Sequence, residues 1–192
     1  HGRRGVVTAA EALAERGRRA AQLGPVHYLV PNAGIAELAD GLDMAAFDRQ
    51  WAVNGAGALN TLAVMRNELA KPASVVFVGT FLIRSTFPGL AAYIASKAAL
   101  AAQARTLAVE FAPLDVRINM VSPGPTATAI WGTLGLTDDQ LEGVADGVTK
   151  RLLPGHFLES AAVANVILFQ LSQGARGVFG QDWVVDNGYT IS

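Results

Sequence analysis

The chain has 192 residues, of which 51% are hydrophobic and 16% are charged, and its formal net charge is −1. These values fit one globular domain over residues 1–192 and give no basic surface for nucleic acid or an anionic membrane. The lack of cysteine excludes disulfides, the three scattered histidines predict no metal site, and no apolar run is long enough to span a membrane.

The first predicted elements are a helix and a strand. Thr8 and Glu11 have the spacing of a capping box, which predicts a helix over residues 9–22 that a Gly-Pro pair ends. Residues 26–30 are then expected to form a short buried strand.

Pro31 and the three residues after it follow that strand. In an open parallel sheet, ligands bind beyond the carboxyl ends of the strands, where Asn32, Ala33 and Gly34 are placed. Glycine at this point permits a close approach of the backbone. A plain strand-ending turn is the alternative.

Asp43 is expected to cap a long helix that runs to about Leu69. Asn54 lies inside this helix, with Gly55 and Gly57 nearby. Asparagine and glycine are poor helix formers, and an asparagine amide competes for backbone groups. We therefore expect a local distortion at Asn54.

Residues 74–79 form a continuous apolar run, which is typical of a strand covered on both faces. An irregular loop over residues 81–90 should follow. The alanine-rich sequence after it predicts a long helix from Leu90 to about Phe111.

Tyr93 and Lys97 are four positions apart in that helix, so their side chains lie on one face. A tyrosine with its usual pKa of about 10 exchanges protons poorly at neutral pH. We expect the Lys97 ammonium to lower the pKa of Tyr93 and to make the pair a general acid/base. Thr80 ends the preceding strand, thirteen residues before Tyr93, and its hydroxyl could bond a substrate oxygen.

Another strand is predicted over residues 116–121, and Ser-Pro-Gly-Pro follows it. Pro123 and Gly124 therefore reach the same edge of the sheet as Thr80. The hydroxyls of Thr126 and Thr128, with nearby backbone amides, could clasp a carboxamide; a capped helix start is the alternative reading.

Residues 129–157 are the least regular part, within an insert that spans residues 125–157, and a short helix is expected after Thr137. Long irregular inserts at a ligand-binding edge are commonly lids. We expect this one to cover a substrate with an apolar body, although a surface excursion packed on its own side chains is an equal alternative. His156 is expected to be a loop or core residue.

The chain should end with a helix that Ser160 caps and that runs to about Ser172, terminated by glycines at 174 and 177. A final strand is predicted over residues 181–186.

In these motifs the chain resembles the short-chain dehydrogenase/reductase family over nearly its whole length. The matching segments are residues 32–34, Asn54, residues 88–92, the Tyr-x-x-x-Lys pattern at 93–97, residues 122–125 and residues 180–188. Two positions depart from the family: Thr80 stands where serine is usual, and Pro31 stands where asparagine is usual.

The resemblance implies a Rossmann-like, doubly wound parallel α/β sheet with helices on both faces. It also implies a cytoplasmic NAD(P)-dependent oxidoreductase that interconverts an alcohol and a ketone or aldehyde. In such an enzyme Tyr93 exchanges the proton, Thr80 orients the substrate oxygen, and Lys97 holds the nicotinamide ribose. Asn54 bends its helix and supports a proton relay to the lysine.

By the same resemblance, Asn32, Ala33 and Gly34 hold the ribose of the cofactor. The nicotinamide amide is bound by four residues: Pro123, Gly124, Thr126 and Thr128. The helices that bear Asn54 and Tyr93 also form a subunit interface in the family, so we expect a homo-oligomer, a dimer or tetramer.

No glycine-rich phosphate-binding turn precedes Asn32. We therefore expect the chain to lack the family's N-terminal strands, and its residues do not distinguish NAD from NADP. One alternative function is a catalytically silent binding or scaffold subunit. Another is a dehalogenase- or epimerase-like lyase, although the dehalogenase branch would carry arginine in place of Lys97.

Overall fold

Four parallel strands form one sheet in the computed structural model, which describes residues 10–192. In hydrogen-bonded order they are β1 (Val26–Leu29), β2 (Leu69–Val78), β3 (Val116–Pro123) and β4 (Asp182–Val185). Every neighbouring pair is parallel; Val75 pairs with Ile118, for example. Parallel neighbours need crossover connections, and helices supply them. The predicted parallel α/β sheet is confirmed.

The helices lie on both faces of this sheet. They are α1 (Ala10–Ala21), α2 (Met44–Trp51), α3 (Gly57–Met65), α4 (Ala91–Phe111), α5 (Asp138–Thr149) and α6 (Ser160–Leu171). Shorter turns are η1 (Ala52–Ala56), η2 (Arg66–Glu68), η3 (Phe81–Arg84), η4 (Ala112–Leu114), η5 (Ala129–Thr133) and η6 (Gln173–Ala175).

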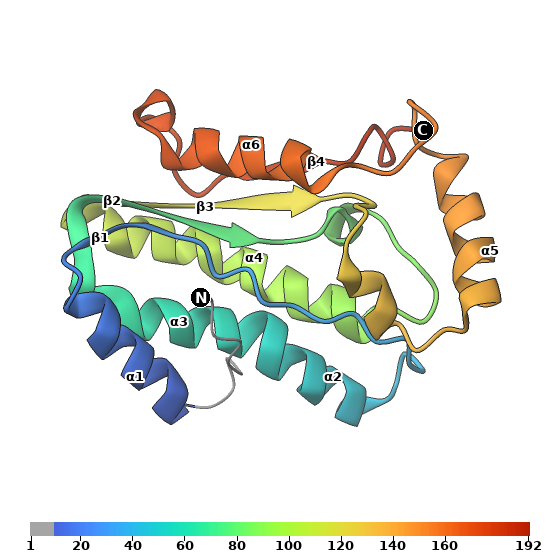
Figure 1. Cartoon of the computed structure of the whole chain (residues 1–192), viewed down its shortest axis with the longest axis horizontal. Helices are drawn as coiled ribbons and strands as arrows, with labels where there is room; N and C mark the ends of the chain where they lie inside the picture. Colours follow the sequence, from blue (N-terminus) through green and yellow to red (C-terminus); the bar gives the residue numbers. More distant parts are fainter. Residues whose placement is uncertain (1–9) are drawn as a thin grey trace.

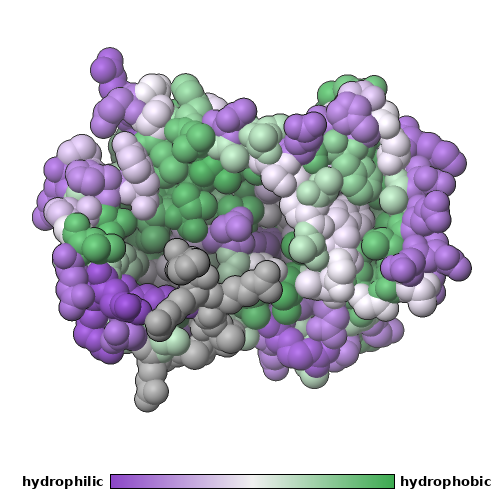
Figure 2. All heavy atoms as spheres, in the orientation of Figure 1, coloured by the Kyte–Doolittle hydropathy of each residue, from purple (hydrophilic) through white to green (hydrophobic). Residues whose placement is uncertain are grey.

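Figure 1 shows α2, α3 and α4 on one side of the sheet, with α1 against α3, and α6 on the other side. Helix α5 lies beyond the carboxyl ends of β2 and β3 (Figure 1). Figure 2 shows hydrophilic side chains gathered over α1 and α5, and an apolar area between α6 and β1. None of the helices within the described part of the chain is both long and apolar enough to cross a membrane.

The core lies on both sides of β2 because side chains alternate along a strand. Val75 and Phe77 join the cluster under α4 that contains Leu100. Val76 joins the cluster under α6 that contains Val163. This double coverage explains the continuous apolar run of the strand.

The strand expected to be buried at residues 26–30 is instead an edge strand of the described sheet. Within residues 10–192, β1 pairs only with β2, and Tyr28 is 59% exposed. The prediction of burial was wrong because periodicity does not show which strand of a sheet is outermost. The expected capping box at Thr8 lies outside the described residues.

Two other boundaries differ from prediction. Strand β2 begins at Leu69 rather than Ser74, since Leu69 is buried and pairs with Val26. Residues 81–90 begin with the 3₁₀ turn η3 rather than an irregular loop.

The predicted cap of α6 was also wrong. Ser160 is already helical, and Glu159 occupies the cap position with no side-chain hydrogen bond. The helix ends at Leu171, where extended Ser172 stops it, before either predicted glycine.

Candidate active site

Thr80, Tyr93 and Lys97 meet where β2 ends and α4 begins. Thr80 follows Gly79 after β2, and Tyr93 and Lys97 lie one turn apart on the buried face of α4. Only 3%, 7% and 4% of these three residues is exposed. The Thr80 side chain is close enough to the Tyr93 hydroxyl to influence the pKa of the phenol. The structure therefore brings together the three residues that the spacing predicted.

The pKa of Tyr93 is raised from its ordinary value, not lowered. Burial is the main cause because it disfavours the phenolate, and the Thr80 side chain opposes it more weakly. Lys97 directs its ammonium elsewhere: Nζ donates to the Val78 carbonyl at 2.8 Å. The predicted lowering was wrong for this arrangement, in which burial favours the protonated phenol of Tyr93.

Burial also lowers the pKa of Lys97, to about 8. Removing an ammonium from water disfavours its charged form. At neutral pH the side chain is still mostly protonated, so it places a positive charge at the carboxyl end of β2.

The helix that bears Asn54 is distorted, as predicted. Residues 52–56 form a π-helical turn between α2 and α3, in which the Gly57 N–H donates to the Ala52 carbonyl. The buried Asn54 amide holds Ile35: Oδ1 accepts from its N–H and Nδ2 donates to its carbonyl, both at 2.9 Å. π-turns often occur at functional sites.

Asn54 thereby anchors the loop that contains Gly34. A Cβ at Gly34 would lie 3.3 Å from Asn54 Oδ1 and 3.5 Å from Lys97 Nζ, so the backbone at Gly34 packs closely against both side chains. Pro31 has no N–H to donate, and the loop is held instead through Ile35, one residue after Gly34.

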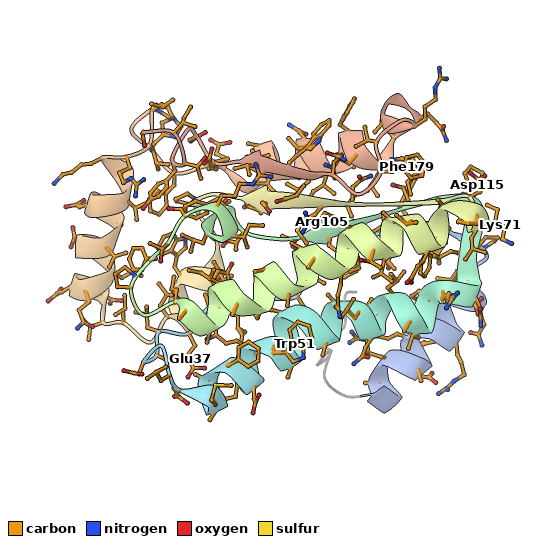
Figure 3. All side chains as sticks on the ribbon, turned by 180° about the vertical axis from the view of Figure 1, so that it is seen from behind. Glu37, Trp51, Lys71, Arg105, Asp115 and Phe179 are labelled. Atoms are coloured by element: carbon orange, nitrogen blue, oxygen red, sulfur yellow. The ribbon has the colours of Figure 1, made fainter. Side chains whose placement is uncertain are left out.

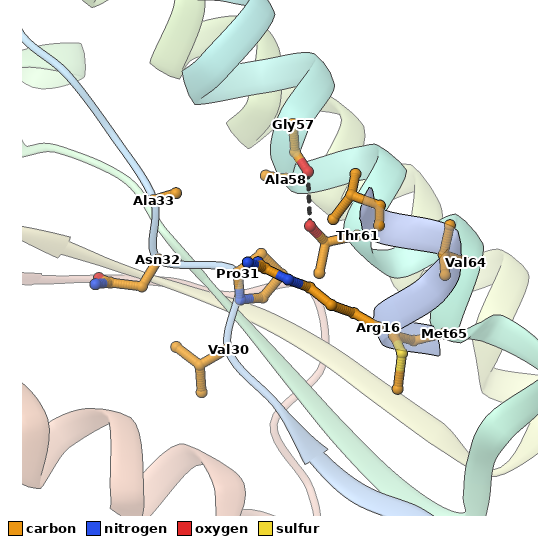
Figure 4. A pocket seen from close by; sticks show the side chains of 11 residues that line it. Arg16, Val30, Pro31, Asn32, Ala33, Gly57, Ala58, Thr61, Val64 and Met65 are labelled. Atoms are coloured by element: carbon orange, nitrogen blue, oxygen red, sulfur yellow. Dashed lines mark hydrogen bonds between the residues drawn. The ribbon is translucent and has the colours of Figure 1, made fainter. Parts of the chain in front are cut away.

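A cavity of about 170 Å³ adjoins this loop (Figure 4). Pro31, Asn32 and Ala33 line one side, and Thr61 of α3 lies opposite. Figure 4 shows the Arg16 side chain reaching from α1 toward Pro31. Asn32 and Ala33 are exposed here, at the carboxyl end of β1.

The segment after β3, which Pro123 ends, uses most of its polar groups internally. A Cβ at Gly124 would lie 2.5 Å from Asp186 Cα, so the two backbones touch. Thr126 is buried, and its hydroxyl donates to the Gly124 carbonyl at 2.9 Å. Thr128 is exposed and makes no side-chain cap for η5. Thr128 is therefore the threonine with a hydroxyl open to a ligand.

Residues 125–157, which we call the lid segment, pack against Tyr93. Trp131 and Leu134 belong to the same apolar cluster as Tyr93. Between η5 and α5 lies a cavity of about 570 Å³, lined by Thr128, Trp131 and Phe157 among others. The rings of Trp131 and Phe157 stack with centroids 5.1 Å apart. The predicted helix after Thr137 is α5, and the exposed His156 is a loop residue as expected.

Three polar residues that sequence reasoning missed contact the site: Gln50, Ser96 and Thr133. Ser96 is fully buried; its Oγ accepts from Asn54 Nδ2 at 3.1 Å and donates to the Tyr93 carbonyl at 2.7 Å. Gln50 and Ser96 lie at helical spacing from Asn54 and Tyr93, a signal that could have identified them. Thr133 gave no such signal.

Comparisons with known proteins give a consistent result. Residues 7–190 match a family model described as enoyl-(acyl carrier protein) reductase. Carbonyl reductase (NADPH) 2 of Sus scrofa is 33% identical over 175 residues, which cover 88% of this chain and 70% of that protein. The 2,3-dihydro-2,3-dihydroxybenzoate dehydrogenase of Escherichia coli is 33% identical over 171 residues, covering 85% and 69%.

A solved structure shows the same fold. A short-chain dehydrogenase/reductase of Brucella melitensis, titled glucose/ribitol dehydrogenase, has a TM-score of 0.88 at 24% identity. The match covers 98% of this chain and 75% of that one. The span of the family match includes every residue of the site described above.

Proposed function

The chain belongs to the short-chain dehydrogenase/reductase family of NAD(P)-dependent oxidoreductases, and we propose that Tyr93 is its acid/base in interconverting an alcohol and a ketone or aldehyde. The observation that carries this proposal is the buried cluster in which Tyr93 lies beside Thr80 and one turn from Lys97. The relatives are named as reductases and dehydrogenases, which favours an enzyme over a silent binding subunit.

The residues around this cluster fit a dinucleotide. Because Gly34 has no side chain, its backbone lies close to Lys97 Nζ. The cavity beside Asn32 and Ala33 lies at the carboxyl end of β1, where parallel sheets bind nucleotides. When bound, the nicotinamide supplies or accepts a hydride at the substrate's reacting carbon. The pig relative is named for NADPH, which makes NADPH the first cofactor to test, with NAD beside it.

The side chains then have distinct roles. In reduction, the Tyr93 hydroxyl donates its proton to the carbonyl oxygen, and Thr80 orients that oxygen by a hydrogen bond. Lys97 holds the ribose, and Asn54 supports the proton relay to it. Because burial keeps Tyr93 protonated, this arrangement serves reduction directly.

The nicotinamide amide is assigned to the segment after β3. Backbone groups at Pro123 and Gly124 and the open hydroxyl of Thr128 would hold it. The hydroxyl of Thr126 is bonded within the turn, so Thr126 would contribute by shaping the turn.

The lid segment is proposed to cover the substrate. Support comes from the stacked rings of Trp131 and Phe157 on the 570 Å³ cavity, and from the cluster that joins Trp131 to Tyr93. Apolar and aromatic walls suit a substrate with an apolar body.

A homo-oligomer is proposed through α4. Four exposed alanines follow one face of this helix at helical spacing: Ala91, Ala95, Ala98 and Ala102. Small side chains permit the close approach of a second helix. A cytoplasmic location stays an expectation from the family resemblance.

The test is the Tyr93→Phe variant, assayed for NADPH- and NADH-dependent reduction of a panel of ketones and aldehydes. Loss of the proton donor should reduce kcat about 10²–10⁴-fold. Fluorescence titration with NADPH should give unchanged binding, and circular dichroism an unchanged fold.

Tyr28→Phe is the matched control, because Tyr28 is exposed on the edge strand. It should keep wild-type turnover. Full turnover by Tyr93→Phe would refute the assignment.

A further inference from the structure

Residues 35–37 form an unusual segment, in which side chains bond both backbone groups of each residue. On one side the partners come from the distorted helix. The Asn54 amide bonds the N–H and carbonyl of Ile35, both at 2.9 Å. The Gln50 amide accepts from the Glu37 N–H and donates to its carbonyl, both at 3.1 Å. We call residues 35–37 the clamp segment.

This helix side of the clamp segment is well protected. Gln50 and Asn54 are one turn apart and have 0% exposure. Figure 3 shows Glu37 beside α2, the helix that ends at Trp51. Breaking either pair would leave buried amide groups without partners, which is costly.

On the other side, Ala36 is held by the lid segment. Thr133 Oγ1 accepts from the Ala36 N–H at 2.9 Å and donates to its carbonyl at 2.8 Å. The alternation of partners along residues 35–37 is expected for an extended chain between two layers, since successive peptide groups point to opposite sides. A contact between residues 97 positions apart thus ties η5 to the clamp segment.

The Thr133 side is the weaker one. Its hydroxyl also lies 2.7 Å from the Ile130 carbonyl within η5. A hydroxyl has one proton, so donation to Ala36 competes with donation to Ile130. Thr133 is exposed as well, so water competes for the same group.

We propose that Gln50 and Asn54 form the permanent side of the clamp segment and Thr133 the releasable side, so that Thr133 positions the lid segment. Thr133 ends η5, which also carries Trp131, and the Trp131 indole N–H is bonded to the Thr126 carbonyl at 2.8 Å. Holding Thr133 therefore fixes the Trp131 wall of the larger cavity. The link from this wall to substrate binding rests on the proposed function; the clamp itself does not.

The clamp is tested by residue-resolved amide hydrogen exchange on ¹⁵N-labelled full chain. Thr133→Val removes the hydroxyl at nearly constant shape, and Thr133→Ser keeps it. In Thr133→Val the Ala36 amide should exchange about tenfold faster, with Ile35 and Glu37 unchanged. Thr133→Ser should match the wild type, because it keeps the hydroxyl.

Two exchange results would overturn the proposal. An unchanged Ala36 amide would show that Thr133 does not hold it. Equal acceleration at residues 35, 36 and 37 would show that the segment opens as one unit, with no separate releasable side.

The kinetic arm uses NADPH and the best carbonyl substrate of the panel. Thr133→Val should raise KM about three- to tenfold with kcat nearly kept, and Thr133→Ser should restore KM. An unchanged KM would overturn the link to substrate positioning. A wild-type chain that bound NADPH but reduced nothing would count against the proposed function, while exchange would still decide the clamp.

Discussion

At the scale of single residues, Lys97 should make stability depend on pH. Its pKa is about 8 in the folded protein and 10.5 ordinarily, so between these values the unfolded chain binds more protons. The free energy of unfolding should therefore rise as pH increases from about 8 to 10, by up to roughly 3 kcal/mol. Urea unfolding at pH 7, 8, 9 and 10 measures this rise.

Lys97→Met is the control, because it removes the titrating group while keeping most of the stem. In this variant the rise should disappear, and parallel profiles for the two proteins would contradict the account. Measurements stay at or below pH 10 because Tyr93 acts with the opposite sign. Its raised pKa contributes stability that is lost at higher pH.

The same two residues show what spacing can and cannot predict. The spacing of Tyr93 and Lys97 placed both side chains on one helix face, and the structure agrees. The shift in the pKa of Tyr93 was predicted in the wrong direction because burial raises this pKa, and the ammonium bonds the Val78 carbonyl on β2. That partner comes from tertiary structure and has no signal in the helix sequence.

At the scale of elements, the π-turn η1 depends on Gly55. A Cβ there would lie 2.0 Å from the ring of Trp51. Gly55→Ala should therefore destabilise the fold by about 1–3 kcal/mol, because Trp51 or the turn must shift. Thermal and urea unfolding measure the loss.

Gly143→Ala is the matched control within α5, where a Cβ would meet no atom within 4 Å. Replacing this helical glycine should stabilise the protein by up to about 1 kcal/mol. If Gly55→Ala stabilised it equally, steric crowding at the π-turn would be disproved.

The sequence predicted some features of the helices and strands correctly and others wrongly, and each outcome has a physical reason. The distortion at Asn54 was predictable because asparagine and glycine both weaken a helix locally. The start of β2 was not, because Lys71 and Pro72 separate Leu69 from the apolar run, and a proline within a run argues against a central strand. The exposed edge position of β1 depends on its neighbours in the sheet, which the run of residues 26–30 does not encode.

At the scale of the whole molecule, the sequence predicted which segments lie close together. The carboxyl ends of parallel strands meet at one edge of the sheet, so the segments that follow those strands are neighbours. Thr80, Gly34 and Thr128 follow three different strands, and the topology places all three at the carboxyl edge. The clamp segment was unpredictable, since Ala36 and Thr133 are 97 residues apart and neither belongs to a known motif. Side chains that form hydrogen bonds with a loop backbone leave no periodic pattern in the amino-acid sequence.

The assembly of the molecule gives the last prediction. If the alanine face of α4 is a subunit interface, Ala98→Glu places a charge where a second helix approaches closely, and burying that charge without a partner is costly. Sedimentation velocity should then show a smaller species than for the wild type, with unchanged circular dichroism. Ala161→Glu, an exposed position in the first turn of α6, should sediment as the wild type does. A wild-type chain that sediments as a monomer, or an Ala98→Glu variant that keeps the wild-type size, would remove α4 as the interface.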